Sequence, residues 1–358
     1  MAPLVVSAPG RLDFLNTHQD YKGLPVVSVA VNLRTYIRLR PGTGCRLKSR
    51  NTGDQCHFTP GEPPEGRSFC DYAKAAVLAL LKAGVPVKGC EGEVDSQIPI
   101  GAGMASSAAL LVALVAGLGR LHGAAWDLYQ VAELAYAAER EILGVPCGRL
   151  DQYGSAFGYI SLIHPKPPVK VERLSLEGGV FVVLDSGVRH STAEVHRRRQ
   201  EELQHAVDAL KRVLGVEAEG FWDFPWHILD EGVVEQLPEP GRSRVLFTIE
   251  MQKSTEEALR VMKSRLPTGE KLRRVGEAMT YQHKLLSTLY EVSLPQLDQL
   301  VEKAVEAGAY GAKLSGAGLG GVVIALAPDR ETAVKIGRSS EAARWWVVEV
   351  DRGLEYGN

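Results

Sequence analysis

The sequence predicts an α+β protein, and three observations support this class. Segments typical of strands lie at both ends of the chain, near residues 4–7 and 345–350. Segments with helical spacing fill most of the middle. The two kinds mix without the strict strand–helix alternation of a parallel sheet. At 358 residues the chain is long enough for two domains, and the proline-rich segment 165–168 predicts a division into residues 1–168 and 169–358.

The N-terminal half opens with strands, predicted at residues 4–7, 26–31 and 35–39, with Pro9-Gly10 as a break after the first. Helices are predicted at 72–83, from about Ser106 into the apolar run that follows, and at 126–143. Glycine and proline come directly after the first and third of these helices and end them.

The C-terminal half alternates long amphipathic helices with short strands. The predicted helices are 194–214, 244–263 and 271–289, with an irregular, proline-rich stretch at 222–240. The predicted strands are 180–184, 322–326 and 345–350, and residues 311–321 are expected to form a glycine-rich loop.

Charge and composition exclude several classes of protein. A net charge of −2 argues against a nucleic-acid partner, which would require a basic excess. The longest apolar stretch, Ala108–Leu118, is about 11 residues and too short to cross a membrane. The five cysteines form no C-x-x-C pair, and the chain shows no signal peptide. We therefore expect a reduced, cytoplasmic protein without a membrane partner.

The segment Gly316–Gly321 matches the dinucleotide-binding pattern G-x-G-x-x-G. That fingerprint requires a strand before the loop and a helix after it, because the pyrophosphate sits on the helix N-terminus. Here a predicted strand, 322–326, follows the loop. The sequence therefore does not predict NAD binding, and it lacks the P-loop, zincin and esterase motifs as well.

A second glycine-rich loop, around Gly101 and Gly103, has a better context for binding phosphate. The glycines permit close approach of the backbone to a ligand, and the N-terminus of the helix that begins near Ser106 favours an anion. Ser106 and Ser107 supply hydroxyls at the helix start. They could bind a metal associated with phosphate, or they could only cap the helix.

Three segments, in this order, resemble the three motifs of the GHMP kinases. They are Ala8-Pro9-Gly10-Arg11 with His18-Gln19-Asp20-Tyr21, then Gly101-Ala102-Gly103-Met104-Ala105-Ser106-Ser107-Ala108, then Leu314-Ser315-Gly316-Ala317-Gly318-Leu319-Gly320-Gly321. Within that superfamily the chain is most similar to galactokinases, with supporting segments at 138–141, 147–152, 188–191 and 290–298.

The resemblance implies a two-domain fold and a reaction. The N-terminal domain would be like the second domain of ribosomal protein S5, the C-terminal domain would be α+β, and the active site would lie in the cleft between them. The implied reaction is phosphoryl transfer from ATP, with Mg²⁺, to a small-molecule hydroxyl.

The resemblance also assigns roles to individual residues. Asp151 matches the catalytic aspartate, and Arg11 matches the arginine that faces it. Ser107 and Glu139 match the Mg²⁺ contacts. The expected contacts to the ATP phosphates are Gly101, Ala102, Gly103, Met104, Ala105, Ser106, Ser107, Gly316 and Gly318. The expected contacts to the sugar are Thr17, His18, Asp20 and Gly148.

The sugar side departs from galactokinases in two places. Galactokinases have Glu-His-Thr-Asp-Tyr where this chain has Thr17-His18-Gln19-Asp20-Tyr21. Thr17 thus replaces the glutamate that binds the hexose around its far hydroxyl, and a threonine accepts fewer hydrogen bonds and would tolerate a carboxylate on the substrate. After Ser191 the chain is about three residues shorter than galactokinases and lacks their pocket tyrosine.

Three functions remain open from the sequence. The first is a kinase acting on the C1 hydroxyl of galactose or a close relative. The second is a galactokinase-like enzyme for another sugar or polyol, such as a uronic acid, an N-acetylhexosamine, a pentose or an inositol, because sites built around particular hydroxyls discriminate strongly. The third is a sensor that binds sugar and ATP without turnover.

Overall fold

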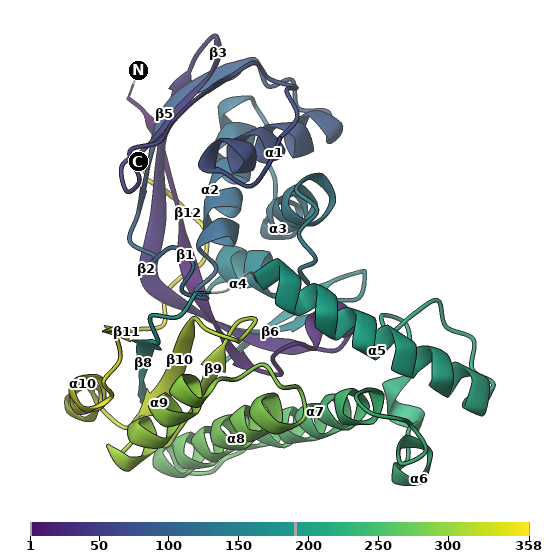
Figure 1. Cartoon of the computed structure of the whole chain (residues 1–358). Helices are drawn as coiled ribbons and strands as arrows, with labels where there is room; N and C mark the ends of the chain where they lie inside the picture. The colour runs from purple at the N-terminus through teal and green to yellow at the C-terminus, as the bar shows by residue number, and fades with distance from the viewer. Residues whose placement is uncertain (1, 190–191, 358) are drawn as a thin grey trace. The chain divides into compact units, whose positions relative to one another are not determined.

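The computed structural model describes residues 2–189 and 192–357, without the side chains of residues 192, 193 and 231. The chain forms two compact units, which Figure 1 shows in a single colour gradient from N- to C-terminus. The first unit contains the chain up to Leu12, Ser28–Ile163 and the residues from Val350 on, and the second contains Asp13–Val27 and His164–Glu349. The central boundary lies close to residue 168, where the sequence places it, whereas Asp13–Val27 and the residues from Val350 on fall in the other unit from the one expected.

The elements of the first unit form a sheet with helices. They are β1 (Leu4–Leu15), β2 (Val26–Pro41), β3 (Gly44–Ser49), β4 (Gln55–Phe58), α1 (Phe69–Lys82), β5 (Gly89–Ser96), α2 (Ser106–Leu121), α3 (Leu128–Ala137), the π-helical turn η2 (Ala138–Ile142), α4 (Leu150–Phe157), β6 (Ile160–His164) and β12 (Glu355–Gly357). The strand order is β12-β1-β2-β5-β3-β4, and β6 pairs with β2. Figure 1 shows α1, α2 and α3 on one side of this sheet.

The C-terminal residues belong to the first unit because strand pairing and a buried arginine hold them there. Strand β12 is antiparallel to β1, with Val5 opposite Gly357. The guanidinium of Arg34 donates to Asp351 Oδ2 at 2.8 Å and to Gly353 O at 2.7 Å. These long-range contacts are not visible in local sequence patterns, which explains why the predicted boundary missed them.

Two strand predictions were wrong in their bounds. Strand β1 continues through Pro9-Gly10 to Leu15, and residues 26–39, predicted as two strands, form the single strand β2. The β12 pairing covers only Val5–Ser7 of β1, so the missing N–H of Pro9 costs no hydrogen bond to that neighbour.

The helices of the first unit follow their sequence signals. Helix α1 begins at a capping box of Ser68 and Asp71, and α3 begins at one formed by Asp127 and Gln130. Helix α2 is buried along most of its length, as its apolar sequence predicts for a helix packed on several sides. The segment predicted as one helix at 126–143 instead ends in the π-helical turn η2, which holds Glu139.

The prediction that every cysteine is reduced was wrong for one pair. Cys56 in β4 and Cys70 in α1 form a disulfide, while Cys45, Cys90 and Cys147 are free thiols. The pair was missed because strand β4 itself was not predicted, so nothing in the sequence placed residue 56 next to the start of α1. None of the helices in residues 2–189 and 192–357 is long and apolar enough to cross a membrane.

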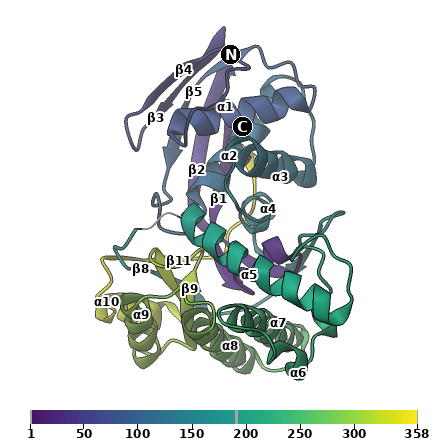
Figure 2. The same ribbon diagram turned by 45° about the vertical axis from the view of Figure 1, so that its right-hand side comes forward.

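The second unit contains a smaller sheet and the long helices. Its elements are η1 (Asp20–Lys22), β7 (Lys170–Leu174), β8 (Val180–Asp185), α5 (Thr192–Leu214), η3 (Trp226–Ile228), α6 (Glu231–Val234), α7 (Gly241–Lys263), α8 (Thr268–Thr288), α9 (Pro295–Glu306), β9 (Gly311–Ser315), β10 (Val322–Ala327), α10 (Arg330–Ser339) and β11 (Arg344–Val348). The strand order in its sheet is β11-β8-β10-β9, and all neighbours are antiparallel. Figure 2 shows α7 and α8 running side by side in this unit.

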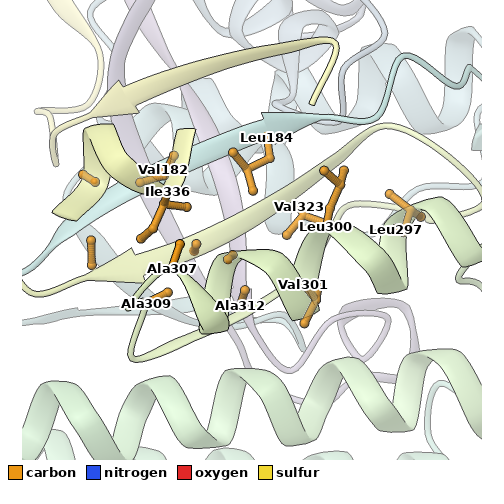
Figure 3. Close-up of a cluster of buried hydrophobic side chains, with 14 residues drawn as sticks. Val182, Leu184, Leu297, Leu300, Val301, Ala307, Ala309, Ala312, Val323 and Ile336 are labelled. Atoms are coloured by element: carbon orange, nitrogen blue, oxygen red, sulfur yellow. The ribbon is translucent and has the colours of Figure 1, made fainter. Parts of the chain in front are cut away.

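A cluster of buried side chains joins this sheet to α9 and α10 (Figure 3). Alternate residues of the strands contribute, as the two-residue period of a strand requires: Val182 and Leu184 from β8, then Val323, Ala325 and Ala327 from β10. The opposing helices contribute Leu297, Leu300, Val301, Ala304, Ala333 and Ile336. Residues 311–315, predicted as loop, form strand β9 because they pair with β10 along their whole length.

Candidate active site

The predicted phosphate loop connects β5 to α2 in the first unit. Gly101 and Gly103 have φ angles of 69° and 77°, and Ala105 is also left-handed, at 55°. Ala105 is the cap residue of α2 and provides no side-chain hydrogen bond to the helix. The hydroxyl of Ser107 donates instead to Glu139 Oε1 at 2.9 Å. The loop therefore leads directly into an uncapped helix N-terminus, an arrangement that favours an anion.

Arg11 in β1 connects this loop to the start of α4. Its backbone N–H donates to Met104 O at 3.2 Å, and its Nη1 donates to Gly103 O at 2.9 Å. Its Nε and Nη2 both donate to Asp151 Oδ1, at 2.8 Å and 2.5 Å. Because Arg11 is 4% exposed, water competes little for these bonds. One guanidinium thus holds the glycine-rich loop and Asp151 together.

Asp151 lies in the first turn of α4, where the helix dipole favours a negative charge. Its side chain is 28% exposed, so a substrate can reach it. Gly148, the predicted sugar contact, lies three residues earlier in the irregular segment before α4. The structure therefore brings Arg11, Asp151 and the loop together in one unit.

Glu139 is buried between Ser107 and Gln152. Its Oε1 accepts from Ser107 Oγ, and its Oε2 accepts from Gln152 Nε2 at 2.6 Å. Burial raises the pKa of Glu139 to about 7, and the negative charge of Asp151 acts in the same direction, while the two hydrogen bonds oppose the shift. The ionised carboxylate, which is the form that binds a cation, therefore appears near neutral pH.

The donor set at this position fits Mg²⁺. Within residues 2–189 and 192–357, no three His, Cys, Asp or Glu side chains gather closely enough to hold a metal on their own. Ser107 and Glu139 offer one hydroxyl and one carboxylate. This suits an ion that keeps several waters and shares oxygens with a phosphate.

The predicted sugar residues 17, 18 and 20 lie in the second unit, after the end of β1. Asn16 and His18 are both left-handed, with φ angles of 67° and 65°. Such backbone strain in residues other than glycine concentrates at functional sites. Thr17 is 1% exposed, and its hydroxyl donates to Asp13 Oδ1 at 2.9 Å and accepts from Lys313 Nζ at 2.7 Å.

His18 forms one chain of hydrogen bonds with two tyrosines. Its Nε2 is 3.0 Å from Ala317 O, its Nδ1 is 3.1 Å from Tyr21 Oη, and Tyr21 Oη is 2.6 Å from Tyr290 Oη. Burial lowers the pKa of His18 well below 6.5, and the nearby charges of His196 and Lys22 lower it further. The imidazole is therefore neutral, with Nε2 donating to the carbonyl of Ala317. In this arrangement His18 positions the second glycine-rich turn.

Asp20 begins the short helix η1, and its Oδ1 accepts from the backbone N–H of Tyr21 at 2.9 Å. Two residues later, Lys22 is fully buried, donates to Thr248 Oγ1 at 2.8 Å, and lies over the rings of Phe247 and Tyr290. Burial lowers the pKa of Lys22 well below 10.5, although the charge of Asp20 opposes this.

The second glycine-rich segment forms the turn between β9 and β10, and the strand that follows it was predicted. Gly316 and Gly318 have φ angles of 89° and 86°. A Cβ on Gly318 would lie 2.2 Å from Val292 O, so only glycine fits there. The pattern G-x-G-x-x-G is therefore a hairpin turn, and no helix follows it.

Several residues of the site were not predicted from the sequence. Gln152 and Lys313 hydrogen-bond the predicted residues Glu139 and Thr17 directly. Tyr290 reaches the predicted His18 through Tyr21. Gln152, Tyr290 and Lys313 each lay within or beside a segment that supported the family resemblance, which was the only available signal. Of the segment 188–191, His190 and Ser191 lie outside the described residues.

Three family models match this chain. The N-terminal domain of GHMP kinases matches residues 71–159, the C-terminal domain of GHMP kinases matches residues 257–341, and the galactokinase galactose-binding signature matches residues 1–41. The last match includes position 17, where the family's glutamate is replaced.

Curated relatives and solved structures agree with these models. The galactokinase of Pyrococcus furiosus is 30% identical over 99% of both chains, and that of Thermococcus kodakarensis is 32% identical over 90% of this chain and 88% of the relative. Lactococcus lactis galactokinase complexed with galactose has a TM-score of 0.85 at 23% identity, covering 99% of this chain and 95% of that one. Methanococcus jannaschii mevalonate kinase has a TM-score of 0.73 at 20% identity, covering 97% and 98%. The predicted α+β class and two-domain fold are confirmed.

Proposed function

Because the chain belongs to the galactokinase family of the GHMP kinases, we propose that it transfers the γ-phosphoryl group of MgATP to the C1 hydroxyl of galactose. It is a galactokinase-type sugar kinase, and therefore a phosphotransferase that acts on a sugar hydroxyl. The observation that carries the proposed phosphoryl transfer is the Arg11 bridge, in which one guanidinium binds both Gly103 O and Asp151 Oδ1. Since ATP is the donor, we also propose that the enzyme acts in the cytoplasm.

Residues 101–107 would hold the ATP phosphates. The loop contains three left-handed residues, a backbone conformation found in anion-binding turns, and the start of α2 adds the positive end of its dipole. Gly316 and Gly318 would allow close approach of a second backbone segment to the phosphates.

Ser107 and Glu139 would hold Mg²⁺. When bound, the ion neutralises the phosphate charge that grows during transfer. Glu139 must be deprotonated to bind it, and its pKa of about 7 makes this binding sensitive to pH near neutrality. The hydrogen bonds from Ser107 and Gln152 keep the carboxylate in position.

Asp151 would accept the proton of the attacking hydroxyl or orient that hydroxyl. The C1 oxygen forms a bond to the γ-phosphorus, the bond from that phosphorus to the oxygen bridging it to the β-phosphorus breaks, and ADP leaves. The hydroxyl proton would pass to Asp151 if Asp151 is the base, and to an oxygen of the transferred phosphoryl group if Asp151 only orients the hydroxyl. Arg11 compensates the charge of Asp151 and would stabilise negative charge on the transferring group.

The sugar side supports galactose less strongly than the phosphate side supports a kinase. Asp20 keeps the family's carboxylate, while the Thr17 hydroxyl already has partners on Asp13 and Lys313. This observation favours one second candidate, a galactokinase-like kinase whose sugar differs from galactose at its far end.

ATP consumption measured with Mg²⁺ over a panel of sugars tests the proposal. The panel contains galactose, N-acetylgalactosamine, galacturonate, glucose, arabinose and myo-inositol, with reactions lacking sugar or Mg²⁺ as controls. We expect saturable turnover with galactose. Turnover on another member with none on galactose would replace the substrate, and ATP binding without turnover on any member would indicate a sensor instead of a kinase.

A further inference from the structure

A buried lysine lies against Thr17. Lys313 in β9 is fully buried, and its Nζ donates to Thr17 Oγ1 at 2.7 Å, Asp13 O at 2.8 Å and Leu314 O at 2.9 Å. An ammonium group has three donors, so these contacts use its hydrogen-bonding capacity. A buried charge of this kind also needs an opposite charge nearby.

Asp13 supplies that charge through the Thr17 hydroxyl. Thr17 Oγ1 donates to Asp13 Oδ1 and accepts from Lys313, so it lies between the carboxylate and the ammonium group. Asp13 is 3% exposed. Its backbone N–H donates to Ser315 Oγ at 2.9 Å, which fixes Asp13 to the strand that carries Lys313.

The family places a glutamate at position 17, and the threonine found here cannot neutralise a lysine. We propose that Asp13 provides, from four residues earlier, the carboxylate that galactokinases carry at position 17. Asp13, Thr17 and Lys313 then form one neutral unit that sets how the end of the sugar remote from C1 is recognised. This inference rests on the proposed function, since it concerns the sugar of the same site.

The unit changes what the site offers to that end of the sugar. The proton of Thr17 is donated to Asp13 and one of its lone pairs is taken by Lys313, whereas a glutamate would present a carboxylate with several acceptor positions. The enzyme should therefore depend little on the hydroxyl at C6. We expect 6-deoxygalactose to be phosphorylated with a kcat/KM within about tenfold of that for galactose, the loss expected for one neutral hydrogen bond.

Thermal unfolding of variants tests where the carboxylate resides. Asp13→Asn should lower the midpoint by about 5–10 °C, because it leaves Lys313 buried without its counter-charge. The exchange variant, which carries both Asp13→Asn and Thr17→Glu, should recover at least half of that loss in the midpoint. Asp95→Asn, on a 42% exposed side chain of β5, is the matched control and should shift the midpoint by less than about 2 °C.

A second set of variants, the double-mutant cycle of Thr17→Val with Asp13→Asn, avoids introducing a new buried charge. Thr17→Val removes the bridging hydroxyl alone, so it should destabilise the protein. Combining it with Asp13→Asn should cost clearly less than the two single losses together, because both variants break the same unit. Additive losses in this cycle, or no recovery in the exchange variant, would overturn the proposal.

Kinetics test the consequence for specificity. The ratio of kcat/KM for galactose to that for 6-deoxygalactose should rise about tenfold in the exchange variant, while the ratio for 2-deoxygalactose stays within about twofold. A parent enzyme that prefers galactose over 6-deoxygalactose by more than about a hundredfold would refute the specificity argument. If the parent phosphorylates no sugar, the proposed function fails, whereas the two stability cycles still decide whether Asp13 is the counter-charge of Lys313.

Discussion

Replacing Glu139 by glutamine should stabilise the metal-free protein at alkaline pH. The Glu139 pKa is about 7 in the folded state against an ordinary 4.5, so the folded protein prefers the protonated form. The stabilisation that this raised pKa gives the parent is therefore fully present below pH 4.5 and is lost as the pH rises through about 7. At about 1.36 kcal/mol for each unit of pKa, the full loss is about 3 kcal/mol. A neutral glutamine avoids this loss.

The structure also accommodates the amide. Gln152 Oε1 is buried with no hydrogen-bond partner among the described residues, so a rotated Gln152 can accept from the new amide while Ser107 still donates to its oxygen. We expect Glu139→Gln to raise the free energy of unfolding by about 1 kcal/mol at pH 5 and about 3 kcal/mol at pH 8.

Urea unfolding in EDTA at the two pH values measures this difference. Glu133→Gln is the control with the opposite sign. Burial of Glu133 favours the protonated form, but hydrogen bonds from Arg149 and Tyr153 outweigh it and lower the pKa. This variant should therefore lose stability at both pH values. A Glu139→Gln protein that is destabilised at pH 8, or stabilised equally at pH 5 and pH 8, would refute the reasoning.

Three other variants probe catalysis and packing. Asp151→Asn should reduce kcat by about 10²–10⁴-fold while the Kd for ATP, measured by calorimetry, stays within about threefold; turnover at the parent rate would remove Asp151 from the mechanism. Gly318→Ala should lower the free energy of unfolding by about 1–3 kcal/mol, because the methyl group would meet Val292 O at 2.2 Å, and an unchanged urea midpoint would contradict this. Cys70→Ser should cost about 3 kcal/mol, since the Cys56–Cys70 disulfide closes a loop with a sequence separation of 14; a loss below about 1 kcal/mol would show that the crosslink adds little to stability.

The sequence was most informative where structure depends on local signals. Helices α7 and α8 lie where amphipathic spacing predicts them, and the context of Gly316–Gly321 correctly excluded a dinucleotide fold. Prediction failed where distant pairing overrides local preference. Strand β1 passes through Pro9-Gly10 as part of a sheet, and β9 forms in a glycine-rich segment because β10 pairs with it.

In the candidate site, too, the local motifs were informative and the long-range contacts were not. The motifs indicated Arg11 and Asp151, which are 140 residues apart in sequence and hydrogen-bonded in the structure. The partners of Thr17 could not be inferred in this way, because Lys313 lies 296 residues from Thr17 and directly before a motif with a different assigned role. The replacement at position 17 was visible in the sequence, while the charge that compensates it required the structure.

The position of the phosphoryl group in the product tests the central proposal most directly. Galactose, ATP and Mg²⁺ are incubated with the enzyme, and the product is examined by ³¹P–¹H correlation NMR. We predict a phosphorus coupled to the anomeric proton, as in a galactose 1-phosphate, formed in equal amount to ADP. Phosphorus coupled to any other sugar proton, or ADP formed without a sugar phosphate, would contradict the account.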